Sequence, residues 1–412
     1  MLIRCVAFPL ACELPTEAKS LLEDFRLAAN QAIRIGLTGR VSSRNGITKL
    51  AYHRLREEHP GMFAQHLVSS FEVAASALKN HRRSLRKRRK AAVPFFKHLM
   101  MKAENQAYKL DRTRGIIDLP IKAGQHVKLE LSVSEYHRKY LADSTLSLGS
   151  LTLLSDRAIV AFRKEPPRPV AVTSVIALDT NERSMDGVLV SGRDRGLARS
   201  LRVAYPHVAT TQRCHHDRRK RLQMKKANDR RTSRQLCHRE GKRGHDRVSY
   251  WVHQVANAVV KFAEERSSAI VLENLTEMRP RYNKEMNRRL SMWPWRMLHY
   301  CIEYKAAWRG LPVMKVDPRY SSRRCPICGR IQYSRMGTGQ KEFRCECGWH
   351  LDRHINASLN LLQTAISGGL EVAGGLRFNP GAFQHDVVMI LYEPAMAARS
   401  EPNGTSGVEA VT

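Results

Sequence analysis

Acidic residues are scarce in this sequence. Its 412 residues include 38 Asp and Glu against 70 Lys and Arg, which gives a formal net charge of +32 at pH 7. Such an imbalance makes a folded chain repel itself unless a polyanion offsets the charge. We therefore expect nucleic acid as the partner.

Long apolar runs and processing signals are also missing. The sequence has no run of about 18 apolar residues and no lipidation motif, so we expect no membrane partner. The opening stretch MLIRCVAFPLACELP has no small-residue cleavage site and suits a single strand. We therefore predict a cytoplasmic protein, without internal repeats.

Cysteines are few, and their spacing separates two kinds. Five of the nine are scattered, and we interpret them as small buried hydrophobic residues. The other four form the pairs Cys325-x2-Cys328 and Cys345-x-Cys347, each followed by a glycine. This pattern predicts a structural zinc ribbon, because four thiolates leave no open position for a substrate. His350 is a weaker substitute ligand.

Apolar periodicity divides the chain into segments. Residues 1–14 suggest one strand, 15–110 have helical spacing, and 111–170 alternate with period two and end in a proline-rich linker. Strands and helices then alternate over 171–319, followed by the cysteine segment 320–350 and a helix over 351–367. The tail 368–412 is rich in Gly, Pro and small residues, so we expect it to be mostly disordered.

Two basic runs are candidates for binding nucleic acid, because one-sided charge favours contact with phosphate over a merely solvated face. The candidates in these runs are Arg82, Arg83, Arg86, Lys87, Arg88, Arg89, Arg218, Arg219, Arg221, Lys225, Lys226, Arg230 and Arg231. Trp293 and Trp295 are candidates for stacking on bases. Core packing is an equally good explanation for both tryptophans.

Polar residues at the ends of apolar segments form a second group. Asp179 closes SVIALD, Glu273 closes AIVLE, and Asp352 and His354 open the last helix. Asp352 alone could be a helix N-cap and Asp179 a turn residue, but a carboxylate following AIVL needs a partner if it is buried. Converging acids are what metal-dependent phosphodiester cleavage requires.

Several stretches resemble one family. The stretches VIALDTNERSMDGVLV, AIVLENL, YKAAWRGLPVMKVDPRYSSRRCPICG and FRCECGWHLDRHINASLNLL are similar to the nuclease half of TnpB and the compact type V CRISPR effectors, over about residues 172–365. The resemblance implies an α+β multidomain fold. It comprises a helical recognition lobe, a small β-barrel wedge and an RNase H-like (RuvC) α/β domain with an inserted zinc ribbon.

The resemblance also implies function. It predicts a bound guide RNA, recognition of double-stranded target DNA and a Mg²⁺-dependent site at Asp179, Glu273 and the Asp352/His354 turn, in the prokaryotic cytosol near the nucleoid. It leaves open whether the protein is a monomer or a dimer.

One position departs from the family pattern. The last motif usually reads Asp-Arg-Asp, with the second Asp as metal ligand, whereas this chain reads Asp352-Arg353-His354. Imidazole nitrogen is a poor ligand for Mg²⁺, so we expect one metal ion to be weakened or absent, which would leave a single ion. Asn181, where the family commonly has Gly, is a smaller change because Asn tolerates positive φ.

Three hypotheses follow from this departure. The chain is an RNA-guided DNA-binding protein with an impaired nuclease site, or an active RNA-guided endonuclease in which His354 is a general base or Asp352 swings in. The third is an RNA-binding or transposition accessory protein that retains the fold. DNA cleavage with the variant His354→Asp separates the first two, and co-purifying RNA separates both from the third.

Overall fold

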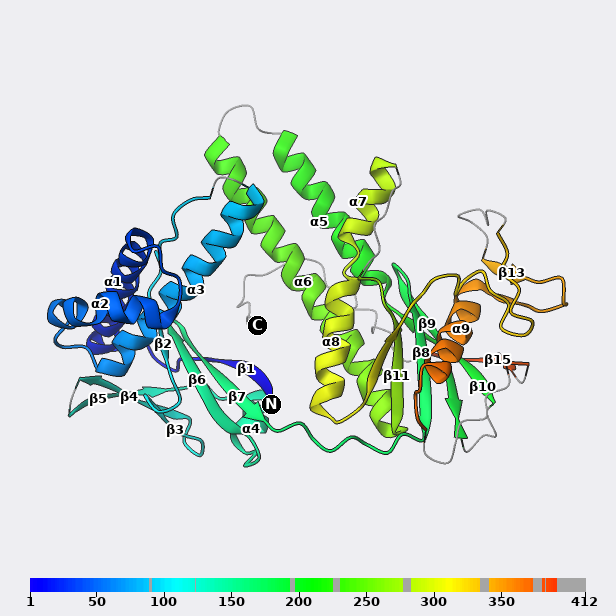
Figure 1. Cartoon of the computed structure of the whole chain (residues 1–412), viewed down its shortest axis with the longest axis horizontal. Coiled ribbons are helices and arrows are strands. Elements are labelled where there is room, and N and C mark those ends of the chain that lie inside the picture. Colours follow the sequence, from blue (N-terminus) through cyan, green and yellow to red (C-terminus); the bar gives the residue numbers. More distant parts are fainter. Residues whose placement is uncertain are drawn as a thin grey trace, which may run out of the picture. The chain divides into compact units, whose positions relative to one another are not determined.

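The computed structural model describes residues 1–88, 91–122, 124–192, 197–224, 230–276, 283–333, 341–372, 380–381 and 383–390. The chain forms two compact units, Met1–Glu165 and Pro166–Thr412. Figure 1 shows the helices and strands of each unit. No helix among these residues has the length and apolarity to span a membrane.

The first unit contains a bundle of three helices, α1 (Thr16–Thr38), α2 (Arg44–Glu58) and α3 (Ala64–Arg88). Helix α1 buries Leu21, Leu22 and Phe25 along one stripe, as helical spacing of apolar residues requires. Helix α2 begins at an N-cap serine, Ser43, whose hydroxyl accepts from the amide of Gly46.

Two antiparallel sheets complete the first unit. One has the strand order β1-β7-β6-β2 and the other β3-β4-β5. The bounds are β1 (Leu2–Pro9), β2 (Met100–Ala103), β3 (Lys109–Asp111), β4 (Ile116–Lys122), β5 (Gln125–Glu130), β6 (Ser147–Leu154) and β7 (Arg157–Lys164), with helix α4 at Glu135–Leu141. An antiparallel bridge between Leu10 and Leu131 links the sheets. β2 and β3 lie in the 15–110 segment that we expected to be helical throughout, because helical spacing ends with α3.

The second unit is built on one mixed sheet with the strand order β12-β11-β8-β9-β10-β15. β8 pairs antiparallel with β9 and parallel with β11. The strand bounds are β8 (Ser174–Thr180), β9 (Ser184–Ser191), β10 (Ala198–Ala204), β11 (Ser268–Glu273), β12 (Val313–Val316) and β15 (Phe383–Ile390).

Helices cover both faces of this sheet (Figure 1). One face packs on α6 and α8 through a core that includes Ile176, Leu272 and Val259. The other packs on α9 through Val175, Val271 and Leu359. The helices are α5 (Pro206–Met224), α6 (Arg230–Glu265), α7 (Lys284–Met292), α8 (Trp295–Trp308) and α9 (Arg353–Ser367). Alternate strand residues therefore belong to opposite cores.

The cysteine segment ends in a small hairpin directly before α9. Its strands are β13 (Glu342–Arg344) and β14 (His350–Asp352), and they pair antiparallel. The tail differs from the expected disorder, since residues 383–390 form β15 and pair parallel with β10. The hydrogen-bonding edge that β10 offers explains why this stretch is ordered, and residues 391–412 lie outside the described residues.

Candidate active site and metal centre

Two carboxylates lie side by side where neighbouring parallel strands end. Leu178 of β8 is aligned with Leu272 of β11, so Asp179 and Glu273 follow at the same edge of the sheet. Strand alternation puts both on the face that packs on α9, because Ala177 and Val271 belong to that core. The sequence-predicted pair is thus together in space.

His354 completes this cluster from the first turn of α9. Its Nδ1 atom lies 2.8 Å from Oδ2 of Asp179, and the two side chains are 33% and 13% exposed. The hydrogen bond with Asp179 raises the pKa of His354, burial opposes the rise, and the negative charges of Asp179, Asp186 and Asp352 add to it. His354, which stands where the family pattern has Asp, therefore points toward Asp179.

Glu273 is held in the interior behind Asp179. It is 6% exposed, and its Oε1 accepts from the amide of Thr180 at 2.9 Å. The hydroxyl of Thr180 lies 2.8 Å from Nε2 of the buried His299. Burial, and next the charge of Asp179, raise the pKa of Glu273 well above its ordinary value. Two carboxylates so placed repel each other, and a cation between them would relieve the repulsion.

Asp352 has a different task. Its Oδ1 accepts from the amides of His354 at 2.8 Å and Ile355 at 3.2 Å, which makes it the N-cap of α9. The carboxylate is thereby committed to the helix N-terminus, as the simpler of our two sequence interpretations has it.

Asp186 is a pocket residue that the sequence analysis missed. It lies directly opposite Asp179 across the β8–β9 pair and is 1% exposed. The side-chain amide of Asn181 donates to Oδ2 of Asp179 at 3.2 Å and to Oδ2 of Asp186 at 3.1 Å. The signal was available, because an acid inside the apolar strand SMDGVLVS needs partners just as Glu273 does.

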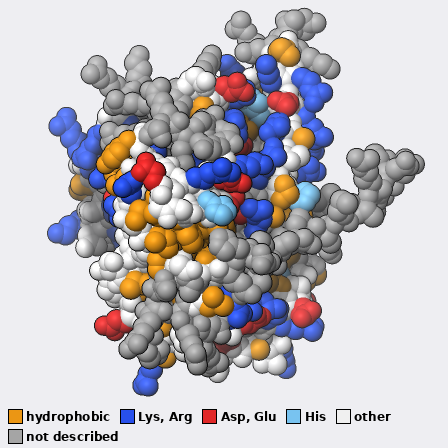
Figure 2. All heavy atoms as spheres, turned by 90° about the vertical axis from the view of Figure 1, so that its right-hand side faces the viewer, with side chains coloured by type: hydrophobic (Ala, Val, Ile, Leu, Met, Phe, Trp, Pro, Cys, Tyr) orange, Lys and Arg blue, Asp and Glu red, His pale blue; other side chains and the backbone are white. Residues whose placement is uncertain are grey.

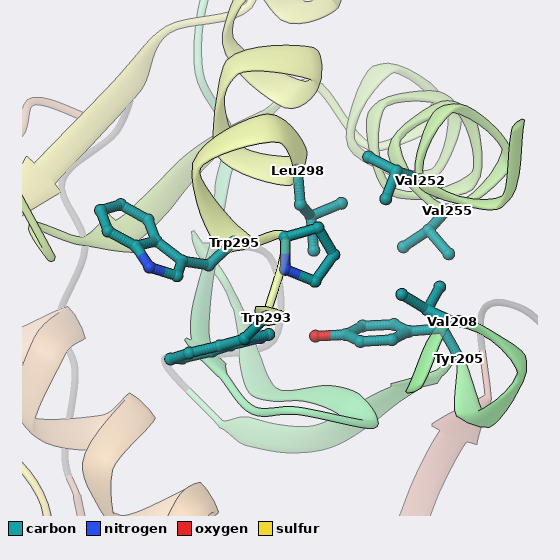
Figure 3. Close-up of a pocket in the computed structure, with 8 residues that line it drawn as sticks. Tyr205, Val208, Val252, Val255, Trp293, Trp295 and Leu298 are labelled. Atoms are coloured by element: carbon teal, nitrogen blue, oxygen red, sulfur yellow. The ribbon is translucent and has the colours of Figure 1, made fainter. Parts of the chain in front are cut away.

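The tryptophan pair packs behind this cluster. Nε1 of Trp293 donates to the carbonyl oxygen of Asn181 at 3.0 Å, and the hydroxyl of Tyr205 donates to the same oxygen at 2.6 Å. Figure 3 shows the rings of Trp293 and Trp295 at an apolar pocket between α6, α8 and the strands. Trp295 is 7% exposed and its ring packs in the core against His299, which favours core packing, the second of our two interpretations, for this residue.

The four clustered cysteines form a thiolate centre. Their sulfurs lie within 4.8 Å of one another, with 3.5 Å between Cys325 and Cys347 and 3.6 Å between Cys328 and Cys345. Four zinc–sulfur bonds of about 2.3 Å in tetrahedral geometry place sulfurs about 3.8 Å apart, so the set fits zinc. Gly329 and Gly348 have φ of 73° and 88°, which turns the backbone toward each pair.

The acidic pocket differs from this centre in the described part of the chain. There the cysteines are the only set of three or more potential ligand residues whose donor atoms converge this closely. Carboxylate oxygens suit a hard cation, whereas the imidazole of His354 does not. Asp179 and Glu273 are thus the ligands that could hold such an ion, and the pocket offers it fewer oxygens than a three-acid site.

The basic candidates are exposed wherever their side chains are described. These residues are Arg82, Arg83, Arg86, Lys87, Arg218, Arg219, Arg221 and Arg231. Arg82 donates to the hydroxyl of Ser42 at 2.7 Å, and Arg218 lies 3.7 Å from Glu240. The side chains of Arg88 and Arg230, and all of Arg89, Lys225 and Lys226, lie outside the described residues. Figure 2 shows basic side chains around acidic ones and a histidine on one face.

A family described as Cas12f1-like, TNB domain, matches residues 295–361. The chain is 27% identical over 247 residues to the TnpB-like protein MJ0751 of Methanocaldococcus jannaschii, covering 58% of this chain and 86% of that protein. It is 35% identical over 111 residues to the CRISPR-associated endodeoxyribonuclease Cas12f1 of Sulfoacidibacillus thermotolerans, covering 26% of this chain and 25% of that protein.

The fold has a counterpart among solved structures. A Cas12f1 chain, determined as a Cas12f1-sgRNA-target DNA complex, matches with a TM-score of 0.56 at 14% identity, covering 84% of this chain and 82% of that one. At this identity the match shows the fold alone. Together the matches confirm the resemblance to TnpB and the compact type V effectors that the sequence motifs predicted.

Proposed function

We propose that this chain, which resembles TnpB and the compact type V CRISPR effectors, is an RNA-guided DNA-targeting protein whose RuvC-like site is impaired in cleavage. It binds a guide RNA and complementary double-stranded DNA. The strand order of the second unit, with β8 paired antiparallel to β9 and parallel to β11, supports an RNase H-like domain. Asp179 and Glu273 stand at the ends of its central strands.

One contact carries the proposed impairment. Nδ1 of His354 lies 2.8 Å from Oδ2 of Asp179, so the imidazole takes up the carboxylate oxygen that would otherwise face a cation. Mg²⁺ prefers oxygen ligands, and the pocket has lost one of them. Asp179 and Glu273 would hold a single ion weakly, and such an ion would stabilise charge on the scissile phosphate. The loss of the clamp around that phosphate costs several kcal/mol in the transition state.

The zinc ribbon serves this site as a scaffold. Cys345 and Cys347 lie between β13 and β14, and β14 leads directly into α9. Zinc bound by the four cysteines would fix the hairpin that leads into α9, whose first turn carries His354. The ribbon therefore contributes position, and the chemistry belongs to the residues that follow it.

Binding to RNA and DNA rests mainly on charge. The net charge of +32 and the exposed arginines of α3 and α5 support contact with phosphate backbones. These contacts do not depend on Asp179 or His354, so impaired cleavage leaves occupancy of the DNA intact.

An active endonuclease is the second candidate. Within the described part of the chain, Nε2 of His354 has no hydrogen-bond partner, while Nδ1 is oriented by Asp179. A ring held this way could take a proton from an attacking water as a general base. Several relatives, Cas12f1 proteins among them, bear the names of DNA endonucleases, which also favours this candidate.

Cleavage of a plasmid that carries the guide-matched target tests the proposal. The full chain is purified with its RNA, the RNA is sequenced, and cutting is followed in Mg²⁺ and in Mn²⁺. We expect His354→Asp to cut roughly 100-fold faster than the wild type, the size expected for restoring a metal-bound transition state. The double variant Asp179→Asn/His354→Asp is the matched control and stays inactive.

Two outcomes would contradict the proposal. Robust cutting by the wild type that His354→Ala abolishes favours the active endonuclease. Absence of any co-purifying RNA favours an accessory protein that retains the fold.

A further inference from the structure

A row of charged residues crosses the sheet beside the acidic pocket. Arg202 of β10 lies opposite Asp186 of β9, which lies opposite Asp179 of β8. Neighbouring strands are about 4.8 Å apart, so the Cα atoms of Arg202 and Asp179 are separated by about 10 Å. Strand alternation puts all three on the α9 face, because Ala198, Val188 and Ala177 belong to that core. Arg202 therefore stands at the rim of the pocket.

The pair formed by Asp186 and Arg202 is strongly asymmetric. The Asp186 side chain is 2% exposed and the Arg202 side chain is 47% exposed. Nε of Arg202 donates to Oδ1 of Asp186 at 2.5 Å, while the hydroxyl of Ser184 and the amide of Asn181 donate to Oδ2. The buried carboxylate is thus fully partnered and fixes the inner end of the arginine.

Within the part of the chain that the structure describes, the outer end of Arg202 is free. Among the described residues, neither of its terminal guanidinium nitrogens, Nη1 and Nη2, donates a hydrogen bond to a protein atom. The hydrogen bond with Asp186 raises the pKa of Arg202, burial opposes the rise, and the charges of Asp186 and Asp352 add to it, so the side chain stays cationic. The Arg202 side chain is 47% exposed, and an arginine anchored through Nε can offer its terminal nitrogens to a phosphate through two parallel hydrogen bonds.

We propose that Arg202 binds a phosphate group of the nucleic acid strand that reaches the acidic pocket, and that Asp186 is the positioning residue that holds it there. The identity of the strand as target DNA rests on the proposed function, whereas phosphate binding itself does not. The cation offsets the charge that Asp179 and Glu273 would present to an incoming phosphate. If the Asp186–Arg202 ion pair were purely structural, it would not need to leave Nη1 and Nη2 of Arg202 without a partner among the described residues.

A charge-balanced double variant separates direct contact from the general field. Asp186→Asn/Arg202→Ala removes one negative and one positive charge and leaves no unpaired carboxylate. The matched control is Glu264→Gln/Arg309→Ala, which dissolves an ion pair of 2.6 Å, with side chains 51% and 34% exposed, away from the pocket. Both pairs belong to the second unit and both double variants keep the net charge.

Binding of a fluorescein-labelled thymidine tetranucleotide to the full chain, with its co-purified RNA retained, is measured by anisotropy over a range of salt concentrations. We expect the Asp186→Asn/Arg202→Ala variant to bind roughly fivefold more weakly and to lose about 1 from the salt slope. The control should bind as the wild type does. Asp186→Asn alone, which keeps the arginine but loosens it, should give a smaller loss of affinity with the slope retained.

Wild-type affinity in the Asp186→Asn/Arg202→Ala variant would overturn the inference, and so would an equal loss in the control. Wild-type affinity in Asp186→Asn alone would overturn the positioning role. If the double variant fails to fold, Arg202→Lys replaces it. Lysine keeps the charge but lacks the fork, so affinity should fall about twofold with an unchanged slope. The tetranucleotide needs no guide, so failure of the proposed function shows in the missing RNA and leaves this measurement intact.

Discussion

The zinc ribbon and the acidic pocket are two candidate metal sites of one unit, and they are assembled in opposite ways. The sulfurs of Cys325 and Cys347 come together from residues 22 apart, whereas Asp179 and His354 meet across 175 residues. The ribbon has four identical soft ligands and closes on itself. The pocket mixes carboxylates with an imidazole, and Arg202, on the same face of the sheet, is half-exposed.

Because of this difference, the thiolate site and the acidic pocket should tolerate substitution to different degrees. In a closed thiolate site every ligand contributes to folding, since binding energy is folding energy. In the pocket, Nδ1 of His354 gives the carboxylate of Asp179 a hydrogen-bond partner, so the fold does not depend on a metal ion there. Scaffold and chemistry therefore respond to mutation separately.

Removal of the ribbon's ligands is the strongest test of the contrast. We expect Cys325→Ser/Cys328→Ser to release about one zinc per chain and to open residues 320–350 to protease, because structural zinc in small domains contributes on the order of 10 kcal/mol. Zinc content by mass spectrometry and limited proteolysis check this. Cys214→Ser is the control and should keep the metal, since this scattered cysteine is exposed and not buried as we expected.

The second test changes charge outside both the ribbon and the pocket. Replacing Arg86, Arg88 and Arg89 with Ala should lower the salt slope of RNA binding by about 2, at about 0.7 per phosphate contact with a single strand. Zinc content should not change. Filter binding at several salt concentrations measures the slope, and an unaltered slope would remove this run from the contact surface.

The third test concerns Asp352, which belongs to the ribbon hairpin and to α9. Asp352→Ala should destabilise the fold by about 1 kcal/mol because α9 loses its N-cap. Asp352→Asn keeps an acceptor and should cost only a few tenths of that. Denaturant unfolding gives both values. A loss of zinc from either variant would show that the cap and the ribbon are not separable.

The smallest expected effect is that of Trp293→Phe. The variant loses the bond from Nε1 to the carbonyl oxygen of Asn181 but keeps the apolar ring. We expect a loss of about 1 kcal/mol or less, since the hydroxyl of Tyr205 still donates to that oxygen. Denaturant unfolding of Trp293→Phe and of Tyr205→Phe measures how much each of the two hydrogen bonds contributes to stability. A large loss of stability in Trp293→Phe, without one in Tyr205→Phe, would show that Trp293 is what holds the loop at Asn181.

Local pattern explains which features could be predicted from the sequence. The cysteine pairs, the helical block and the strand ends at Asp179 and Glu273 are visible because spacing and apolar runs encode them directly. These features need no knowledge of which distant residues meet.

The features that were missed depend on tertiary contacts. Asp186 stands out only once β9 is known to lie beside β8, which puts it opposite Asp179. For Trp295 the sequence left base stacking and core packing open, and only its packing against His299 favours the core. The order of 383–390 arises from pairing with β10, which a Gly- and Pro-rich tail does not indicate.

His354 occupies the oxygen of Asp179 that a divalent ion needs, so the affinity of the pocket for such an ion is the decisive measurement. Titration of the zinc-loaded full chain with Mn²⁺, followed by electron paramagnetic resonance, compares the wild type with His354→Asp. The account predicts that His354→Asp binds Mn²⁺ at least about tenfold more tightly, and that Asp179→Asn removes this gain. Equal Mn²⁺ affinity in the wild type and His354→Asp would contradict it.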